Sequence, residues 1–241
     1  MKAASSYFFI ILLSLPLAPG FAGIRSTAHD FPMFVPELLT LVDVKVCRYC
    51  HRAHSPGPGN VPSPPYNPYL SPSFRSQPGQ PDGASRQCLQ CHDGTKTLGS
   101  LWKVFSGTDL LPRQIKKQYS LGTNLADDHP VSIVYDRHLV RVKGNLADPA
   151  NLPIEVRIDG AGKVQCSSCH DPHSDRFGKF LVMDNRLSQL CTSCHRFPPP
   201  GVVGSGHSAA QGLCQDCHQI HGAYQPQWLL NSKSWDRRIP R

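Results

Sequence analysis

The sequence predicts a mostly irregular fold with short helices and a few short strands. Three observations support this prediction. The 241 residues include 23 prolines and 19 glycines, few segments are long and periodic, and the ten cysteines recur in one kind of motif. An ordinary apolar core is hard to assemble from such a chain, so we expect another group to hold the fold together.

The first 23 residues have the layout of a secretory signal peptide: Lys2, a short apolar stretch over Tyr7–Leu17, and small residues up to Gly23. The apolar stretch is shorter than the roughly 20 residues of a transmembrane helix, and no later segment approaches that length. We therefore expect residues 24–241 to form one exported domain without a transmembrane segment. Its expected location is extracellular or on the outer surface, with the periplasm as the alternative.

All ten cysteines lie in five Cys-x-x-Cys-His motifs. Disulfide bonds do not explain the recurring histidine. Covalent haem does, because two thiols attach the haem as thioethers and the adjacent histidine is an axial ligand of the iron. On one helical turn the three side chains face the same side, so the sequence predicts five covalently bound c-type haems, with zinc as the weaker alternative. The expected attachment residues are Cys47, Cys50, Cys88, Cys91, Cys166, Cys169, Cys191, Cys194, Cys214 and Cys217, and the expected axial histidines are His51, His92, His170, His195 and His218.

Each iron has a second axial position, which a methionine, a histidine or a substrate can occupy. The predicted mature chain holds only Met33 and Met183, too few for five haems. Histidines outside the motifs are more numerous, so we expect two histidines on every iron. These seven are His29, His54, His129, His138, His173, His207 and His221.

Three of the seven, His54, His173 and His221, lie three residues after a motif histidine. The porphyrin would keep such a histidine from the far side of its own haem. We therefore expect each of them to bind the iron of a neighbouring haem.

The other histidines have different surroundings. His129 precedes a predicted short strand at residues 131–135, and His207 lies in a turn of small residues before the last motif, so both are candidate ligands. His138 alternates with apolar residues on a second predicted strand, and we expect it to face solvent or to pack against neighbours.

Three segments complete the expected organisation. Residues 55–82 are proline-rich and should be irregular or polyproline-like, as a loop that lies over a haem or, alternatively, as a disordered linker. Residues 152–166 read as a hairpin that turns at Asp159–Gly162. Residues 222–241 form a basic tail that could pack on a haem or on another subunit.

Several segments, taken in order, resemble a known family: "HDFP…CRYCHRAH", "PGQPDGASRQCLQCHDGT", "LADDHPVSIVYD", "VQCSSCHDPHS" and "KFLVMDNRLSQLCTSCH". They are similar to the multihaem cytochromes with doubled Cys-x-x-Cys-His motifs that metal-reducing bacteria export. The resemblance covers roughly Thr27–His195, and the fifth motif with its "HSAAQGLCQDCHQIHG" departs from the tetrahaem pattern. It implies that His29, His54, His129 and His173 are second ligands.

Some relatives in that family polymerise into electron-conducting filaments. The resemblance therefore implies a homopolymer, in which a histidine near a chain end, His29 or His221, could bind a haem of the adjacent subunit. It also implies a haem-stacked core in place of an apolar one.

The expected function is electron transfer along a row of haems, to redox protein partners or extracellular acceptors. The formal charge of +8 does not indicate a nucleic-acid partner, because the haem propionates would balance most of it and no nucleic-acid-binding motif is present. Pentahaem nitrite reductases carry a catalytic motif that ends in lysine, whereas all five motifs here end in histidine, so we do not expect an enzyme. A soluble periplasmic shuttle is the alternative to a filament or surface conduit.

Overall fold

The computed structural model describes residues 23–25, 27–30, 47, 50–51, 64–70, 78–96, 116–196 and 213–223. The predicted signal peptide, His54, His207, much of the proline-rich loop and nearly all of the basic tail lie outside the described residues. In the described part none of the helices is long and apolar enough to cross a membrane.

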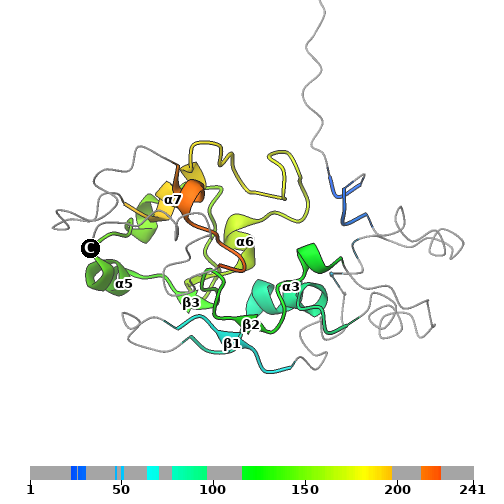
Figure 1. Cartoon of the computed structure of the whole chain (residues 1–241). Helices are drawn as coiled ribbons and strands as arrows, with labels where there is room; N and C mark the ends of the chain where they lie inside the picture. Colours follow the sequence, from blue (N-terminus) through cyan, green and yellow to red (C-terminus); the bar gives the residue numbers. More distant parts are fainter. Residues whose placement is uncertain are drawn as a thin grey trace, which may run out of the picture.

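Short helices carry four of the five motifs, and three of these helices follow one another across the molecule (Figure 1). They are α3 (Gly83–His92), α6 (Cys166–Cys169) and α7 (Gln189–Cys194), with α8 (Cys214–Cys217) at the last motif. The remaining helices are α5 (Arg137–Lys143) and the 3-10 helices η3 (Lys117–Tyr119) and η4 (Pro149–Asn151). Because most other described residues form turns and irregular segments, the prediction of a mostly irregular fold is confirmed.

Two small sheets join distant segments. Strand β1 (Asn67–Pro68) pairs in parallel with β2 (Asn124–Leu125), and β3 (Ile133–Val134) pairs antiparallel with β4 (Lys163–Val164). The strand predicted after His129 is therefore present, although it spans two residues.

The predicted hairpin over residues 152–166 is wrong, because β4 pairs with β3 and not with the segment before the turn. The turn itself forms, with the Gly162 N–H donating to the Asp159 carbonyl over 2.9 Å. A second turn, closed by the Val156 N–H on the Pro153 carbonyl over 3.0 Å, prevents the preceding segment from extending as a strand. The Tyr135 N–H then bonds the Gly162 carbonyl at 2.8 Å, so the partner of β4 comes from β3.

The predicted strand around His138 is also wrong, because residues 137–143 form helix α5. The Asp136 carboxylate caps its start by accepting the Leu139 N–H at 2.7 Å. Gly144 ends it in a left-handed conformation with a φ of 69°. Two capping signals at the correct spacing outweigh a short alternation of apolar residues.

The apolar core of the described part is small. Its one cluster consists of Tyr66, Leu89 and Leu125, with Leu121 packed against it. Tyr66 comes from the described part of the proline-rich loop and donates its hydroxyl to the Asp93 carboxylate at 2.8 Å. The loop therefore packs on α3 at this point.

Candidate haem-binding sites

Each described motif forms one helical turn that closes at its histidine. The backbone N–H of His170 donates to the Cys166 carbonyl at 3.0 Å, and the N–H of His51 donates to the Cys47 carbonyl at 2.8 Å. The motifs ending in His195 and His218 close in the same way. Within such a turn the two cysteines and the histidine project to one side, which is the arrangement that a haem attached at two points and ligated at a third requires.

Four motif histidines each face a second histidine at nearly the same separation. The ring centres are 6.0 to 6.3 Å apart in all four described pairs. The pairs are His51 with His173 (6.0 Å), His92 with His29 (6.2 Å), His170 with His221 (6.3 Å), and His195 with His129 (6.1 Å).

This separation fits one metal ion between the two rings. Two imidazoles on opposite sides of a metal, each with a metal–nitrogen bond of about 2 Å, have ring centres roughly 6 Å apart. The same distance is repeated in four places. The residues present therefore fit four haem irons held between histidines.

The two described histidines that follow a motif histidine by three residues lie beside other motifs. His173 faces His51 of the first motif, and His221 faces His170 of the third. His221, and His29 near the start of the described chain, each face a histidine of the same chain. His54 and His207 lie outside the described residues, and His138 lies on α5.

Hydrogen bonds orient five of these rings. The Nδ1 atoms of His92, His170 and His129 lie 2.8, 2.9 and 3.1 Å from backbone carbonyls. The Nδ1 atoms of His173 and His221 lie 2.9 and 3.0 Å from carboxylates. Carbonyls and carboxylates only accept hydrogen bonds, so Nδ1 donates in every case and Nε2 is left to bind a metal.

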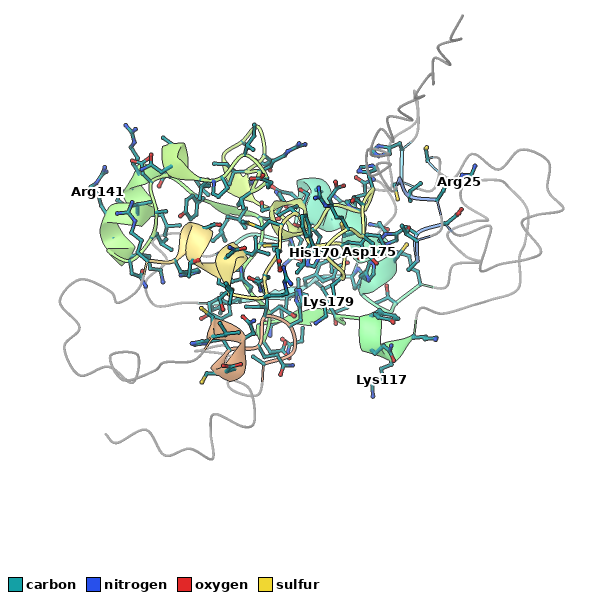
Figure 2. All side chains as sticks on the ribbon, turned by 90° about the horizontal axis from the view of Figure 1, so that it is seen from above. Arg25, Lys117, Arg141, His170, Asp175 and Lys179 are labelled. Carbon is teal, nitrogen blue, oxygen red and sulfur yellow. The ribbon has the colours of Figure 1, made fainter. Side chains whose placement is uncertain are left out.

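His170 shows how backbone from another segment orients a ring. Its Nδ1 donates to the carbonyl of Lys179, and Figure 2 shows the two residues near the middle of the molecule. The Asp171 N–H bonds the Phe180 carbonyl at 2.7 Å, and the Leu181 backbone forms an isolated bridge with His170. The segment after the third motif thus folds back to hold its histidine.

Burial keeps two of the non-motif histidines neutral. Together with the nearby His92, it lowers the pKa of His29 to about 4. It also lowers the pKa of His129 to about 4, with His195 as the next cause. Both rings are therefore unprotonated at neutral pH, as a metal ligand must be.

At two junctions, between the second and third motifs and between the fourth and fifth, the first cysteines of neighbouring motifs lie close together. A hydrogen bond with Cys166 raises the pKa of the Cys88 thiol, and burial adds to the rise. Burial likewise raises the pKa of Cys191, and the nearby Cys214 contributes. The second motif therefore contacts the third through first cysteines, and the fourth contacts the fifth in the same way.

The second cysteines meet at the two other junctions. Burial, with the neighbouring Cys50 as the next cause, raises the pKa of Cys91 to about 12. Burial also raises the pKa of Cys169 to about 12, with Cys194 as the next cause. The five motifs consequently form a row in chain order, and none of the ten cysteines forms a disulfide.

A hollow lies beside the third motif. Cys166 and His221 reach its wall, and Leu89, Leu121 and Leu125 from the core cluster supply an apolar lining. Cofactor sites are mainly apolar. A porphyrin attached at this motif would therefore complete the small core.

Sequence reasoning missed the residues that support these histidines and cysteines. Asp128 accepts from His221 Nδ1, and Gln165 and Ser85 bond the start of α6. Asp128 directly precedes a candidate ligand, His129, but nothing in the sequence links it to His221. Ser85 and Ser188 both lie three residues before the first cysteine of a motif, a shared offset that could have drawn attention to them.

One family model matches the chain. It describes the doubled CXXCH motif and matches residues 160–197, which contain the third and fourth motifs. No curated protein matches. The matched stretch supports a multihaem c-type cytochrome, a class of electron-transfer proteins, with haem covalently bound at its CXXCH motifs.

Proposed function

We propose that the chain is an exported pentahaem c-type cytochrome that passes electrons along a row of haems. The observation that carries the proposal is the set of four histidine pairs, each with ring centres 6.0 to 6.3 Å apart and each containing one motif histidine. Each haem supplies one-electron exchange between ferric and ferrous iron. The chain's own residues attach the haems, orient them and set their order.

Under this proposal the four pairs are the axial ligands of the first four haems. The fifth haem is held by His218 together with a ligand drawn from His54 and His207. Met183 is the only methionine in the described part, and its sulfur accepts a hydrogen bond from the Ser193 hydroxyl at 3.6 Å. Two histidines on an iron leave no open position for a substrate, which supports electron transfer over catalysis.

Export and the electron acceptor rest on the sequence. The signal-peptide layout of residues 1–23 supports export. The resemblance to filament-forming cytochromes supports a homopolymer or surface conduit that delivers electrons to redox proteins or extracellular acceptors. In this form the haem row of one subunit would continue in the next.

One observation favours the alternative of a soluble periplasmic shuttle. His29 and His221, the two histidines considered for a bridge between subunits, face His92 and His170 of the same chain. A subunit whose ligands are internal can carry electrons alone.

The haem count and ligation can be tested on the mature protein. Intact mass spectrometry after acid extraction should show a mass increase of five haems, because thioether bonds survive extraction. Replacing Cys214 and Cys217 together by alanine should reduce the increase by one haem. Optical and paramagnetic resonance spectra of the wild type should show low-spin iron throughout. Fewer than five haems, or a substantial high-spin signal in the intact protein, would contradict the proposal.

A further inference from the structure

Two buried serines occupy equivalent places in the row of motifs. Ser85 lies three residues before Cys88, and Ser188 lies three residues before Cys191. Their side chains are almost wholly inaccessible, with exposed fractions of 0% and 3%. Buried hydroxyls need hydrogen-bond partners, and both serines find them in the next motif along the chain.

Ser85 joins the second motif to the third. Its hydroxyl accepts the backbone N–H of Cys166 at 3.0 Å and donates to the side-chain carbonyl of Gln165 at 2.5 Å. The amide nitrogen of Gln165 donates to Asp82 at 2.9 Å and to Asp159 at 2.8 Å. Gln165 is 1% exposed, so this is a satisfied polar network in the interior, which fixes one arrangement of α3 and α6.

Ser188 joins the fourth motif to the fifth by similar contacts, although its glutamine partner follows the first cysteine instead of preceding it. Its hydroxyl accepts the backbone N–H of Cys214 at 2.9 Å and donates to the side-chain carbonyl of Gln215 at 2.6 Å. Ser188 has a φ of 58°, which non-glycine residues adopt uncommonly. The surrounding contacts hold it there, at the start of α7.

The other two junctions use different contacts. Between the first and second motifs, the Gln87 side chain donates to the Cys50 carbonyl at 2.6 Å. Near the third and fourth motifs, the Val182 N–H donates to the Cys169 carbonyl at 3.0 Å. In the described part, serine bonds to the N–H of a first cysteine only where two first cysteines meet.

We propose that Ser85 and Ser188 are positioning residues that hold the haems in two close pairs, the second with the third and the fourth with the fifth. This inference rests on the proposed electron-transfer function. Each serine is rigidly placed one helical turn from one first cysteine and bonds the backbone of the other, so it fixes the distance between two thioether-bearing haem edges. Electron transfer between the edges moves one electron with no bond made or broken, and its rate falls steeply with that distance.

The experiment compares Ser85→Ala and Ser188→Ala with the wild type, all as holoproteins. Two readouts are needed: amide hydrogen exchange of the peptides that start the third and fifth motifs, and the magnetic interaction between neighbouring ferric irons in paramagnetic resonance spectra. Ser85→Ala should speed exchange at Cys166 by roughly tenfold, since one buried hydrogen bond is lost, and should weaken the interaction between the second and third haems. Ser188→Ala should have the same effects at Cys214 and on the fourth and fifth haems.

Ser193→Ala is the matched control, because the Ser193 hydroxyl donates to the Gln189 carbonyl of its own helix at 2.8 Å. This substitution should change neither the amide exchange nor the magnetic interaction. If a serine variant fails to mature, Gln215→Ala provides a milder test at an exposed residue that accepts from Ser188. Unchanged exchange and unchanged magnetic interactions in variants that retain five haems would overturn the positioning role. A wild type with fewer than five haems would instead overturn the proposed function.

Discussion

At the scale of single residues, the partners of the histidine Nδ1 atoms differ in charge. Backbone carbonyls accept from His92, His129 and His170, whereas carboxylates accept from His173 and His221. A carboxylate makes the imidazole a stronger electron donor, which stabilises ferric over ferrous iron and lowers the reduction potential. The four pairs thus consist of the same residue type, while the surroundings of their rings differ.

We predict that Asp128→Asn raises the reduction potential of the haem held by His170 and His221. Asp128 is 4% exposed and also accepts the Gly222 N–H at 3.2 Å, so its charge is poorly screened. Removing it should shift the potential on the order of 1 kcal/mol, or about 40 mV for one electron. Asparagine keeps an oxygen acceptor for Nδ1, so ligation should survive. Potentiometric titration followed optically would measure the change.

Asp171→Asn is the control for that prediction. Asp171 accepts from His173 at 2.9 Å, but its side chain is 45% exposed and water screens its charge. The haem held by His51 and His173 should therefore change less. Equal shifts in the two variants, or no shift in Asp128→Asn, would show that burial of this carboxylate does not tune the potential.

The motif residues could be predicted from sequence because their chemistry depends on spacing within one helical turn. The role of Asp128 could not be predicted from sequence, because its hydrogen bond with His221 joins residues 93 positions apart. The pairing of His51 with His173 is equally non-local. Local spacing identifies which residues can bind haem, while the fold decides which of them meet.

At the scale of elements, the motif helices depend on their surroundings. Helices α6 and α8 have four residues each, far fewer than an isolated helix needs for stability in water. Side chains cap their starts: the Gln165 N–H donates to the Ser168 hydroxyl at 3.0 Å, and the Leu213 N–H donates to the Asp216 carboxylate at 2.9 Å. The sequence predicts where these helices lie, but not the strand partner of β4, which is set by turns at both ends of the preceding segment.

The segment that supplies the second histidine also sets the angle between the two rings. The described histidines that lie three residues after a motif histidine have ring planes close to parallel with those of their partners. The interplanar angle is 13° for His51 with His173 and 30° for His170 with His221. Histidines from segments that precede their motif, His29 and His129, give planes 81° and 88° from those of His92 and His195. Two kinds of segment therefore give two classes of histidine pair.

We predict that the oxidised protein shows two classes of low-spin paramagnetic resonance signal. Two imidazoles with parallel planes donate to the same iron d orbital, which separates its energy from that of the second d orbital of similar energy. Perpendicular planes donate to one orbital each and leave the two orbital energies nearly equal. The haems of His92 and His195 should therefore have the more anisotropic signals. His129→Ala should remove one signal of this class, and His173→Ala should remove one of the other. A single class of signal in the wild type would show that the ring angles differ from those described.

At the scale of the whole molecule, the apolar core of the described part is small. Its one cluster contains Tyr66, Leu89 and Leu125, and it borders the hollow beside Cys166 and His221. The proline- and glycine-rich composition predicts a small apolar core. The five motifs predict that haems take its place. The order of the motifs in space follows the order in the chain because each motif contacts the next through its cysteines.

The last prediction concerns assembly. Because the rings of His29 and His92 face each other within one chain at 6.2 Å, His29→Ala should convert one haem to high spin without changing the assembly state. Analytical sedimentation at micromolar concentration, with optical spectra of the same samples, would measure both properties. His138→Ala is the control and should alter neither, since His138 lies on α5 and faces no motif histidine among the described ring pairs. If His29→Ala dissolves a wild-type polymer as the spin state changes, His29 binds iron across an interface. If the wild type sediments as a fully low-spin monomer, the shuttle form of the proposed function is the correct one.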